Sequence, residues 1–252
     1  MKKDLAILWS FLTFPFLTPK QVTKLHYSTN SHKYIEKHLL RLVTEGYLTR
    51  QKIPMTLYPY FYSLAEKAVK ELEEKPLFFK QPLPAFSHIP HLLMTNEVMI
   101  AALHLPRVLP DASIFDIRHD FTLKSQLKVA IPDARVVVRI KDEVTPLCFE
   151  VHLKTGEWKT KEKVRKILQS MRSEYRDVFK TDAATWVFLT LNQDTFDKTL
   201  KWIEEELTSI GKENEYDLFR VALVAEENID PLELFKHPIH CIPFKRFHVG
   251  LV

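Results

Sequence analysis

The chain has 252 residues, of which 46% are hydrophobic and 27% are charged, with only 4 Gly beside 15 Pro. This composition is typical of a globular protein with a sizeable core, and it excludes a low-complexity chain. The apolar runs are too short to cross a bilayer and the N-terminus lacks a signal-peptide cleavage site, so we expect a cytoplasmic protein with no membrane-spanning segment.

The two cysteines and the distribution of charge limit which classes of protein this sequence can belong to. Cys148 and Cys241 belong to no cluster of Cys and His at metal-ligand spacing, which argues against a zinc site. The net charge is +4, and residues 1–75 hold 12 Lys and Arg against 7 Asp and Glu. A basic first third on a nearly neutral remainder indicates an N-terminal module that binds a polyanion.

The first elements are helices. Leu5, Leu8, Trp9 and Leu12 recur at helical spacing, which predicts an amphipathic helix over residues 3–13. The sequence "TPKQV" then places Thr at a helix N-cap, Pro at the first helical position and Gln three residues after the cap. This signature predicts a second, short helix that ends near His26.

A third helix is predicted over residues 31–45, with Gly46 at its C-terminal end. Two extended, aromatic-rich runs follow and flank a tip at residues 52–56, and "AEKAVKELEE" predicts a fourth helix. Three helices followed by a hairpin indicate a winged helix-turn-helix over residues 1–75. The third helix would enter a major groove of double-stranded DNA and the hairpin would reach its backbone. The predicted DNA-binding residues are His32, Lys33, Lys37, Arg41, Arg50 and Lys52. The alternative is a winged helix that packs against protein.

Residues 76–88 form a Pro-rich linker to a second domain over residues 89–252. A helix is predicted from residue 89 to 105, then strands at 113–119, 127–140 and 147–153. A helix at 161–179, a strand at 184–191, a helix at 194–210, a strand at 217–224 and a short helix at 231–236 follow. This order predicts an α+β protein whose second domain is a mixed sheet flanked by helices.

Two carboxylates stand out in this second domain. Asp133 and Glu150 lie 17 residues apart on strands that are expected to form a hairpin. Because neighbouring strands are about 4.8 Å apart, the two acids can meet around one divalent ion. Their oxygens suit Mg²⁺ or Mn²⁺, which would polarise a phosphodiester and activate water, and Glu97 could add a third ligand.

The element order, with Pro132-Asp133 on one strand and Glu150-Val151-His152 on the next, resembles the PD-(D/E)XK nuclease superfamily. The resemblance implies a restriction-endonuclease-like fold in which the acids bind metal and a lysine two residues after the Glu assists the attacking water. Here His152 stands in the place of that lysine. The predicted catalytic residues of this degenerate site are therefore Asp133, Glu150, His152 and Lys154, and Lys163 on the following helix offers a substitute charge.

A structural interpretation of the same residues is also open. Asp133 can be a turn acid that follows Pro132, and Glu150 a carboxylate paired with Arg135 or Lys154. His152 can be a hydrogen-bond partner of one acid, which is the commoner role for a single buried histidine.

Nearly the whole chain resembles the replication-relaxation family. The motifs that carry this resemblance are "TPKQVTKL", "HLLRLVTEGYLTR", "HLLMTNE", "IPDA" and "FEVHLKT". The resemblance implies a bacterial protein of plasmids and integrative elements, with a winged-helix head and a degenerate nuclease-like domain. The family's last motif reads E-x-D, whereas this chain has E-x-H.

Three functions follow from these patterns. The first is a DNA-binding accessory protein of plasmid or mobile-element replication or relaxation, with a replication initiator or a relaxase as its protein partner. The second is a Mg²⁺- or Mn²⁺-dependent endonuclease that cuts DNA at Asp133 and Glu150. The third is a transcription regulator. The sequence carries no heptad or other interface signature, so a homodimer is left open.

Overall fold

The computed structural model of this chain describes residues 2–27, 32–52, 60–72, 88–153, 156–179, 184–224, 229 and 241–243. The chain forms two compact units, residues 1–100 and 101–252. The boundary falls inside a helix, α5 (Ile89–Val108), twelve residues beyond the end of the expected linker at residue 88. Residues 73–87, which include most of that linker, lie outside the described residues.

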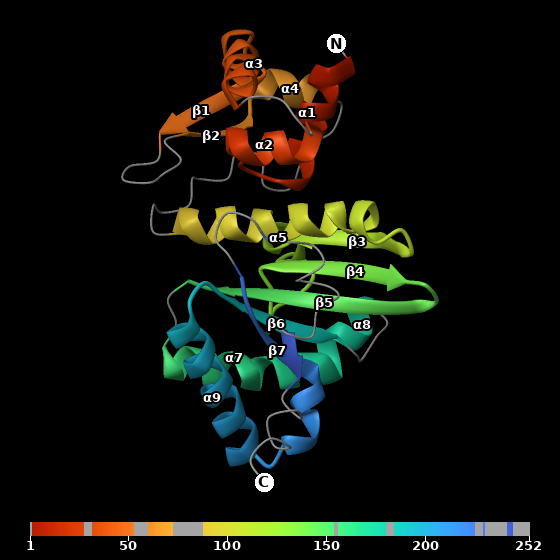
Figure 1. Ribbon diagram of the computed structural model, residues 1–252, viewed down its shortest axis with the longest axis vertical. Coiled ribbons are helices and arrows are strands. Elements are labelled where there is room, and N and C mark those ends of the chain that lie inside the picture. Colours follow the sequence, from red (N-terminus) through yellow and green to blue (C-terminus); the bar gives the residue numbers. More distant parts are fainter. Residues whose placement is uncertain are drawn as a thin grey trace. The chain divides into compact units, whose positions relative to one another are not determined.

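Unit 1 begins with three helices, which are followed by a two-stranded antiparallel hairpin and a short fourth helix (Figure 1). Thr18 and Gln21 form the predicted capping box, because the backbone N–H of each donates to the side chain of the other. Gly46 has a φ of 79° just after the third helix, a conformation that favours glycine. The elements are α1 (Lys2–Thr13), α2 (Pro19–His26), α3 (His32–Thr44), β1 (Leu48–Lys52), β2 (Tyr60–Leu64) and α4 (Glu66–Glu71).

The hairpin of unit 1 is joined by a third extended segment. Leu17, between α1 and α2, forms an isolated antiparallel bridge with Tyr62 of β2. The backbone N–H of each residue donates to the carbonyl oxygen of the other, at 3.1 and 2.9 Å. The bridge holds the start of α2 against the hairpin.

The first turns of α5 belong to unit 1 because polar side chains hold them there. The Asn96 amide donates to the Phe16 carbonyl oxygen at 2.6 Å, and the Gln21 amide donates to the Leu93 carbonyl oxygen at 2.9 Å. Phe16, Phe61, Ile89 and Leu93 form an apolar cluster beside these bonds. These contacts explain why the boundary lies after Ile100 instead of at the Pro-rich segment.

In the described part of unit 2, six strands pair in the order β3-β4-β5-β6-β7-β8. The pairs β3–β4, β4–β5 and β7–β8 are antiparallel, whereas β5–β6 and β6–β7 are parallel, so the sheet is mixed as predicted. The strands are β3 (Ala112–His119), β4 (Ala134–Ile140), β5 (Glu143–His152), β6 (Thr185–Thr190), β7 (Phe219–Leu223) and β8 (Cys241–Pro243). The helices are α6 (Asp120–Leu123), α7 (Glu157–Ser170), η2 (Met171–Tyr175), α8 (Arg176–Phe179), α9 (Gln193–Ser209) and η3 (Glu213–Leu218).

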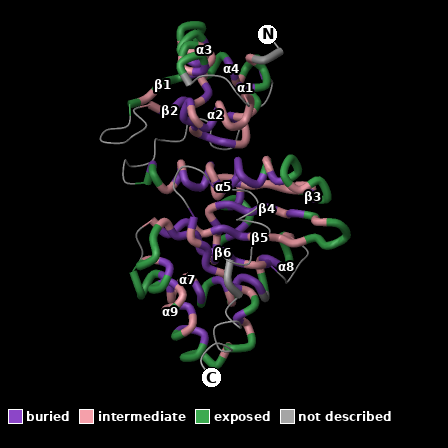
Figure 2. The backbone as a smooth tube through the Cα atoms, in the orientation of Figure 1, coloured by how far each residue is buried: buried purple, intermediate pink, exposed green. Residues whose placement is uncertain are grey.

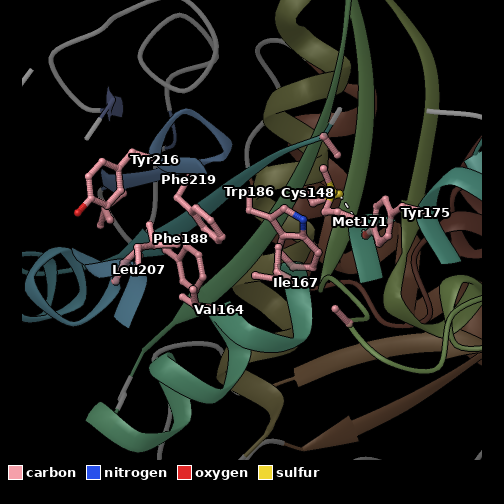
Figure 3. Close-up of a cluster of buried hydrophobic side chains, with 14 of the residues drawn as sticks. Cys148, Val164, Ile167, Met171, Tyr175, Trp186, Phe188, Leu207, Tyr216 and Phe219 are labelled. Atoms are coloured by element: carbon pink, nitrogen blue, oxygen red, sulfur yellow. Dashed lines mark hydrogen bonds between the residues drawn. The ribbon is translucent and has the colours of Figure 1, made fainter. Parts of the chain in front are cut away.

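Helices α7 and α9 cover one face of this sheet, and β6 is buried along nearly its whole length (Figure 2). Figure 3 shows the side chains between these layers, with Trp186 and Phe188 of β6 beside Val164 and Ile167 of α7. The side chains of this helix that pack in the cluster are Val164, Ile167, Leu168, Met171 and Tyr175. Burial of such large apolar side chains is the main force that holds helix to sheet.

One strand starts later than expected. The prediction of strand from residue 127 was wrong, because β4 begins only at Ala134. Pro132 lacks a backbone N–H for a sheet ladder. The segment before it is held instead by Glu174, whose carboxylate accepts hydrogen bonds from the backbone N–H groups of Lys128 and Val129. Pro132 and Asp133 follow this segment and lead directly into β4.

The long helix predicted over residues 161–179 contains an irregularity. It begins four residues earlier, at Glu157, and it widens into the π-helical turn η2 before continuing as α8. The π-turn places the Tyr175 hydroxyl 3.3 Å from the Cys148 sulfur (Figure 3). The predicted helix at 231–236 lies outside the described residues. In the described part of the chain, no helix combines the length and the apolar character needed to cross a membrane.

Candidate functional sites: a basic helix and an acid pair

Helix α3 separates apolar and charged residues onto opposite sides. Ile35, Leu39 and Leu42 are buried in unit 1, whereas Lys33 and Lys37 are exposed. Neither lysine forms an ion pair with any side chain in the described part of the chain. Two ammonium groups one helical turn apart therefore face solvent with their charge uncompensated. The side chain of His32 lies outside the described residues.

Arg41 lies on the same helix, but its guanidinium group is already paired with two carboxylates. Its guanidinium group is 2.5 Å from the Asp4 carboxylate and 2.7 Å from that of Glu45. The His38 ring is 2.6 Å from the same oxygen of Asp4. Burial would raise the pKa of the Asp4 carboxyl, but the hydrogen bond from His38 and the charge of Arg41 lower that pKa to about 2. This cluster ties α3 to α1.

The hairpin carries the two remaining basic residues predicted to meet DNA. Arg50 and Lys52 of β1 are both exposed. The Arg50 guanidinium group stacks 3.4 Å from the centre of the Tyr60 ring on the paired strand. Stacking of this kind fixes the direction of an arginine while leaving its N–H groups able to donate. The tip of the hairpin, residues 53–59, lies outside the described residues.

In unit 2 the structure brings Asp133 and Glu150 together. Ala134 is the first residue of β4 that pairs with β5, opposite Phe149, and the backbone N–H of Asp133 donates to the carbonyl oxygen of the same Phe149, so the ladder is irregular at Asp133. Cys148 and Glu150 are two residues apart on β5, so their side chains project to the same face of the sheet. That face is the one covered by α7, since Cys148, two residues before Glu150, packs in the cluster beneath this helix. The charges of Asp133 and Glu150 both act on the Lys163 ammonium group of α7, so the two acids lie in one neighbourhood.

Each acid has a partner within unit 2. Oδ2 of Asp133 accepts a 2.7 Å hydrogen bond from the backbone N–H of Val151, which continues the ladder past the end of β4. Oε2 of Glu150 lies 2.6 Å from the Lys163 ammonium group on α7. The exposed fractions of the Lys163 and Glu150 side chains are only 19% and 16%. Asp133 therefore acts as the turn acid of the structural interpretation, and Glu150 is paired with a lysine that this interpretation did not name.

Lys163 is held by more than one group. Its ammonium also donates a 2.9 Å hydrogen bond to the carbonyl oxygen of Ile131 and lies 5.3 Å from the centre of the Trp186 ring. Burial would lower the pKa of the Lys163 ammonium, but the negative charges of Glu150 and Asp133 outweigh burial and raise it. Lys163 is therefore protonated at neutral pH and faces the acids as a cation.

Each of the other residues predicted for this site has contacts of its own or lies outside the described residues. His152 is buried, and its ring packs edge-on against Phe188 at 4.9 Å. Lys154 lies outside the described residues. Glu97 belongs to unit 1, where its carboxylate lies 2.5 Å from the Lys24 ammonium group. Arg135, the alternative partner of Glu150, instead lies 2.6 Å from Asp116.

In this arrangement the Lys163 ammonium group stands where a divalent metal ion would meet the Glu150 carboxylate. A metal ion bound by Glu150 would have to approach the oxygen that faces Lys163, and two cations at this distance repel each other strongly in a partly buried site. Among the described residues, no group of three His, Cys, Asp or Glu side chains could hold a metal ion. The binding of Mg²⁺ or Mn²⁺ at Asp133 and Glu150 therefore stays a prediction, and the positive charge of Lys163 argues against it.

The fold and these two sites define a two-unit α+β protein with a basic surface helix and, in its mixed sheet, an acid pair that faces a lysine. Residues 12–187 match the Replication-relaxation family, and the chain belongs to this family. No curated protein matches the chain.

Two solved structures of the restriction endonuclease FokI, one of them bound to DNA, are similar to this chain at 11% identity. Their TM-scores are 0.33 and 0.32, and the matches cover 91% and 90% of this chain. The chain spans only 43% and 44% of the length of those two chains. At these scores the likeness carries no argument about this protein.

Proposed function

We propose that this protein binds duplex DNA through unit 1 as an accessory protein of plasmid or mobile-element replication or relaxation. The observation that carries the proposal is the pair of exposed lysines, Lys33 and Lys37, on the solvent side of α3. Membership of the Replication-relaxation family supports the biological setting. The protein partner would be a replication initiator or a relaxase.

The arrangement of unit 1 supports recognition by a winged helix-turn-helix. Three helices precede the hairpin, and the bridge between Leu17 and Tyr62 supplies the short third strand that such a module places beside its wing. In this mode α3 lies in a major groove, where Lys33 and Lys37 approach phosphates at its rim. Arg50 and Lys52 reach the backbone from the hairpin. Affinity then comes mainly from phosphate contacts and falls steeply with salt.

Fluorescence anisotropy with labelled duplexes tests this proposal. A random-sequence duplex measures the electrostatic part of binding, and rounds of selection from a random pool find a preferred site. The double variant Lys33→Ala/Lys37→Ala should bind more weakly to every duplex. The matched control is Lys159→Ala/Lys166→Ala, which removes two exposed lysines from a helix of unit 2. Equal losses in the two double variants would contradict binding through α3.

Further measurements distinguish the proposed function from the two alternatives. An endonuclease would nick supercoiled plasmid in the presence of Mn²⁺, and Glu150→Ala would abolish nicking. A transcription regulator would select a site in its own promoter, and its loss would leave plasmid copy number unchanged. For the proposed accessory role we expect no nicking, a selected site near a replication or transfer origin, and a change in copy number or transfer on deletion.

A further inference from the structure

The acid pair of unit 2 already contains a cation of its own. The Lys163 ammonium group lies 2.6 Å from Glu150, and it also donates to the carbonyl oxygen of Ile131, two residues before Asp133. One ammonium group therefore bridges three segments of the unit: the entry to β4, the C-terminal part of β5 and the first half of α7.

The surroundings of Lys163 leave it little freedom to move away. Its side chain is 19% exposed, and the Trp186 ring lies 5.3 Å from the ammonium nitrogen. Thr160, Val164 and Ile167 of the same helix are buried, so α7 itself is fixed on the sheet. The side chain of Lys163 is therefore mostly enclosed, and its ammonium group is held by Glu150 and by the carbonyl oxygen of Ile131.

The geometry of the acids agrees with a resident ammonium group. Asp133 uses Oδ2 to accept from the Val151 backbone N–H, a task that leaves its carboxylate beside Glu150 and within the electrostatic reach of Lys163. Two carboxylates placed side by side repel each other unless a cation lies near them. Lysine supplies that cation permanently, whereas a metal ion would supply it only when bound.

We infer that Lys163 is the resident cation of the Asp133–Glu150 pair, so that the centre of unit 2 is a structural ion cluster and not a divalent-metal site. The lysine performs the stabilising part of a metal ion's role, which is to hold two acids and the ends of two strands together. The inference goes beyond DNA binding by unit 1, and its test uses no DNA, so either proposal can fail without the other.

The first test is metal binding by the whole chain. The free Mn²⁺ signal in electron paramagnetic resonance is measured during titration of the wild type, Glu150→Gln, Lys163→Ala and Lys163→Ala/Glu150→Gln. We expect no uptake by the wild type at millimolar Mn²⁺, uptake of one ion by Lys163→Ala, and loss of that uptake in the double variant. Wild-type uptake that Glu150→Gln abolishes would overturn the inference, and so would a folded Lys163→Ala that takes up no Mn²⁺.

The second test is a double-mutant cycle in urea, which also covers the case in which a single variant does not fold. Lys163→Met leaves a partly buried carboxylate without its cation, and we expect the unfolding equilibrium constant to rise by about a hundredfold. Adding Glu150→Gln removes that carboxylate charge, so Lys163→Met/Glu150→Gln should recover at least tenfold. A double variant no more stable than Lys163→Met would show that the lysine does not act through Glu150 and would overturn the inference.

The control for both tests is Lys159→Met on the same helix. Lys159 is exposed, so its substitution should leave both the urea midpoint and the Mn²⁺ titration unchanged. A shift in this variant equal to that of Lys163→Met would assign the effect to helix α7 in general and contradict a specific role for Lys163.

Discussion

Helices α3 and α7 both carry lysines beside an apolar stripe, but the lysines compared, Lys37 and Lys163, have opposite surroundings. On α3 the buried positions are 35, 39 and 42, and Lys37 lies two residues from each of the first two, on the far side of the helix. On α7 the buried positions are 160, 164, 167 and 170, and Lys163 lies three residues after the first and four before Ile167. That spacing puts Lys163 on the edge of the stripe.

The position of a lysine on its helix thus determines which group its ammonium charge interacts with. Lys37 keeps its ammonium group in solvent, where a phosphate can replace water at small cost. Lys163 lies 2.6 Å from Glu150 in a partly buried site, where the charge stabilises the fold and is not available to a ligand. In the two proposals, the same residue type therefore serves a DNA interface in one unit and an internal ion cluster in the other.

The same substitution at the two lysines should have the largest and most contrasting effect on stability. Lys163→Met leaves Glu150 without its cation, and we expect a loss of about 2–3 kcal/mol in the free energy of unfolding. Lys37→Met removes only a solvated charge and should change this free energy by less than about 0.5 kcal/mol. Urea denaturation followed by circular dichroism measures both. Similar losses at the two positions would contradict the comparison.

The second expected effect is on DNA binding, where the order reverses. Lys33→Ala/Lys37→Ala removes two phosphate contacts, so the slope of log affinity against log salt should become shallower by about 2. Affinity at physiological salt should fall by about tenfold or more, whereas Lys163→Met should retain wild-type affinity at temperatures where it stays folded. Anisotropy titrations at several salt concentrations give both quantities. An unchanged slope would place the DNA contacts elsewhere in the chain.

Local signals predicted most of this fold because short-range physics determines it. The capping box of Thr18 and Gln21 and the left-handed Gly46 are properties of a few neighbouring residues, and the structure reproduces both. The late start of β4 and the π-turn η2 were not predicted. Both lie at a contact across 45 or 46 residues, in which Glu174 of η2 accepts hydrogen bonds from the backbone N–H groups of Lys128 and Val129. No local pattern encodes such a contact.

The sequence allowed the acid pair to be predicted. It allowed Lys163 to be named as a nearby charge, but not its contact with Glu150. Chain order and strand length place Asp133 at the start of one strand and Glu150 near the end of the next, which is why the sequence led us to expect the two acids near each other, although the ladder is irregular at Asp133. Lys163 could be named as a nearby charge because it sits on the next helix. Its contact with Glu150 depends on how α7 lies across the sheet, and that is set by side chains such as Trp186 and Phe188 on a strand further along the chain.

The third expected effect concerns acid and the cluster that joins α1 to α3. The pKa of Asp4 is about 2 instead of its ordinary 3.8, so the stabilisation from this carboxylate is complete above pH 3.8 and is lost as the pH falls towards 2. Asp4→Asn should lower the free energy of unfolding by about 1 kcal/mol at neutral pH, discounted for partial exposure. The gap between variant and wild type should close between pH 4 and pH 2. Urea titrations across this range measure the gap, and a gap that does not depend on pH would contradict the assignment.

The smallest expected effect is that of Arg41 on DNA binding. Its guanidinium group already contacts Asp4 and Glu45, at 2.5 and 2.7 Å, so a phosphate must compete with two carboxylates for it. Arg41→Gln should therefore lower affinity less than Lys37→Gln does, by less than about twofold against roughly three- to tenfold. The decisive comparison is made in the Asp4→Asn background, which removes one competitor. There Arg41→Gln should cost more affinity than it does in the wild type, because the guanidinium group is then free to meet DNA. An equal loss in both backgrounds would mean that Asp4 does not withhold Arg41 from the phosphate backbone.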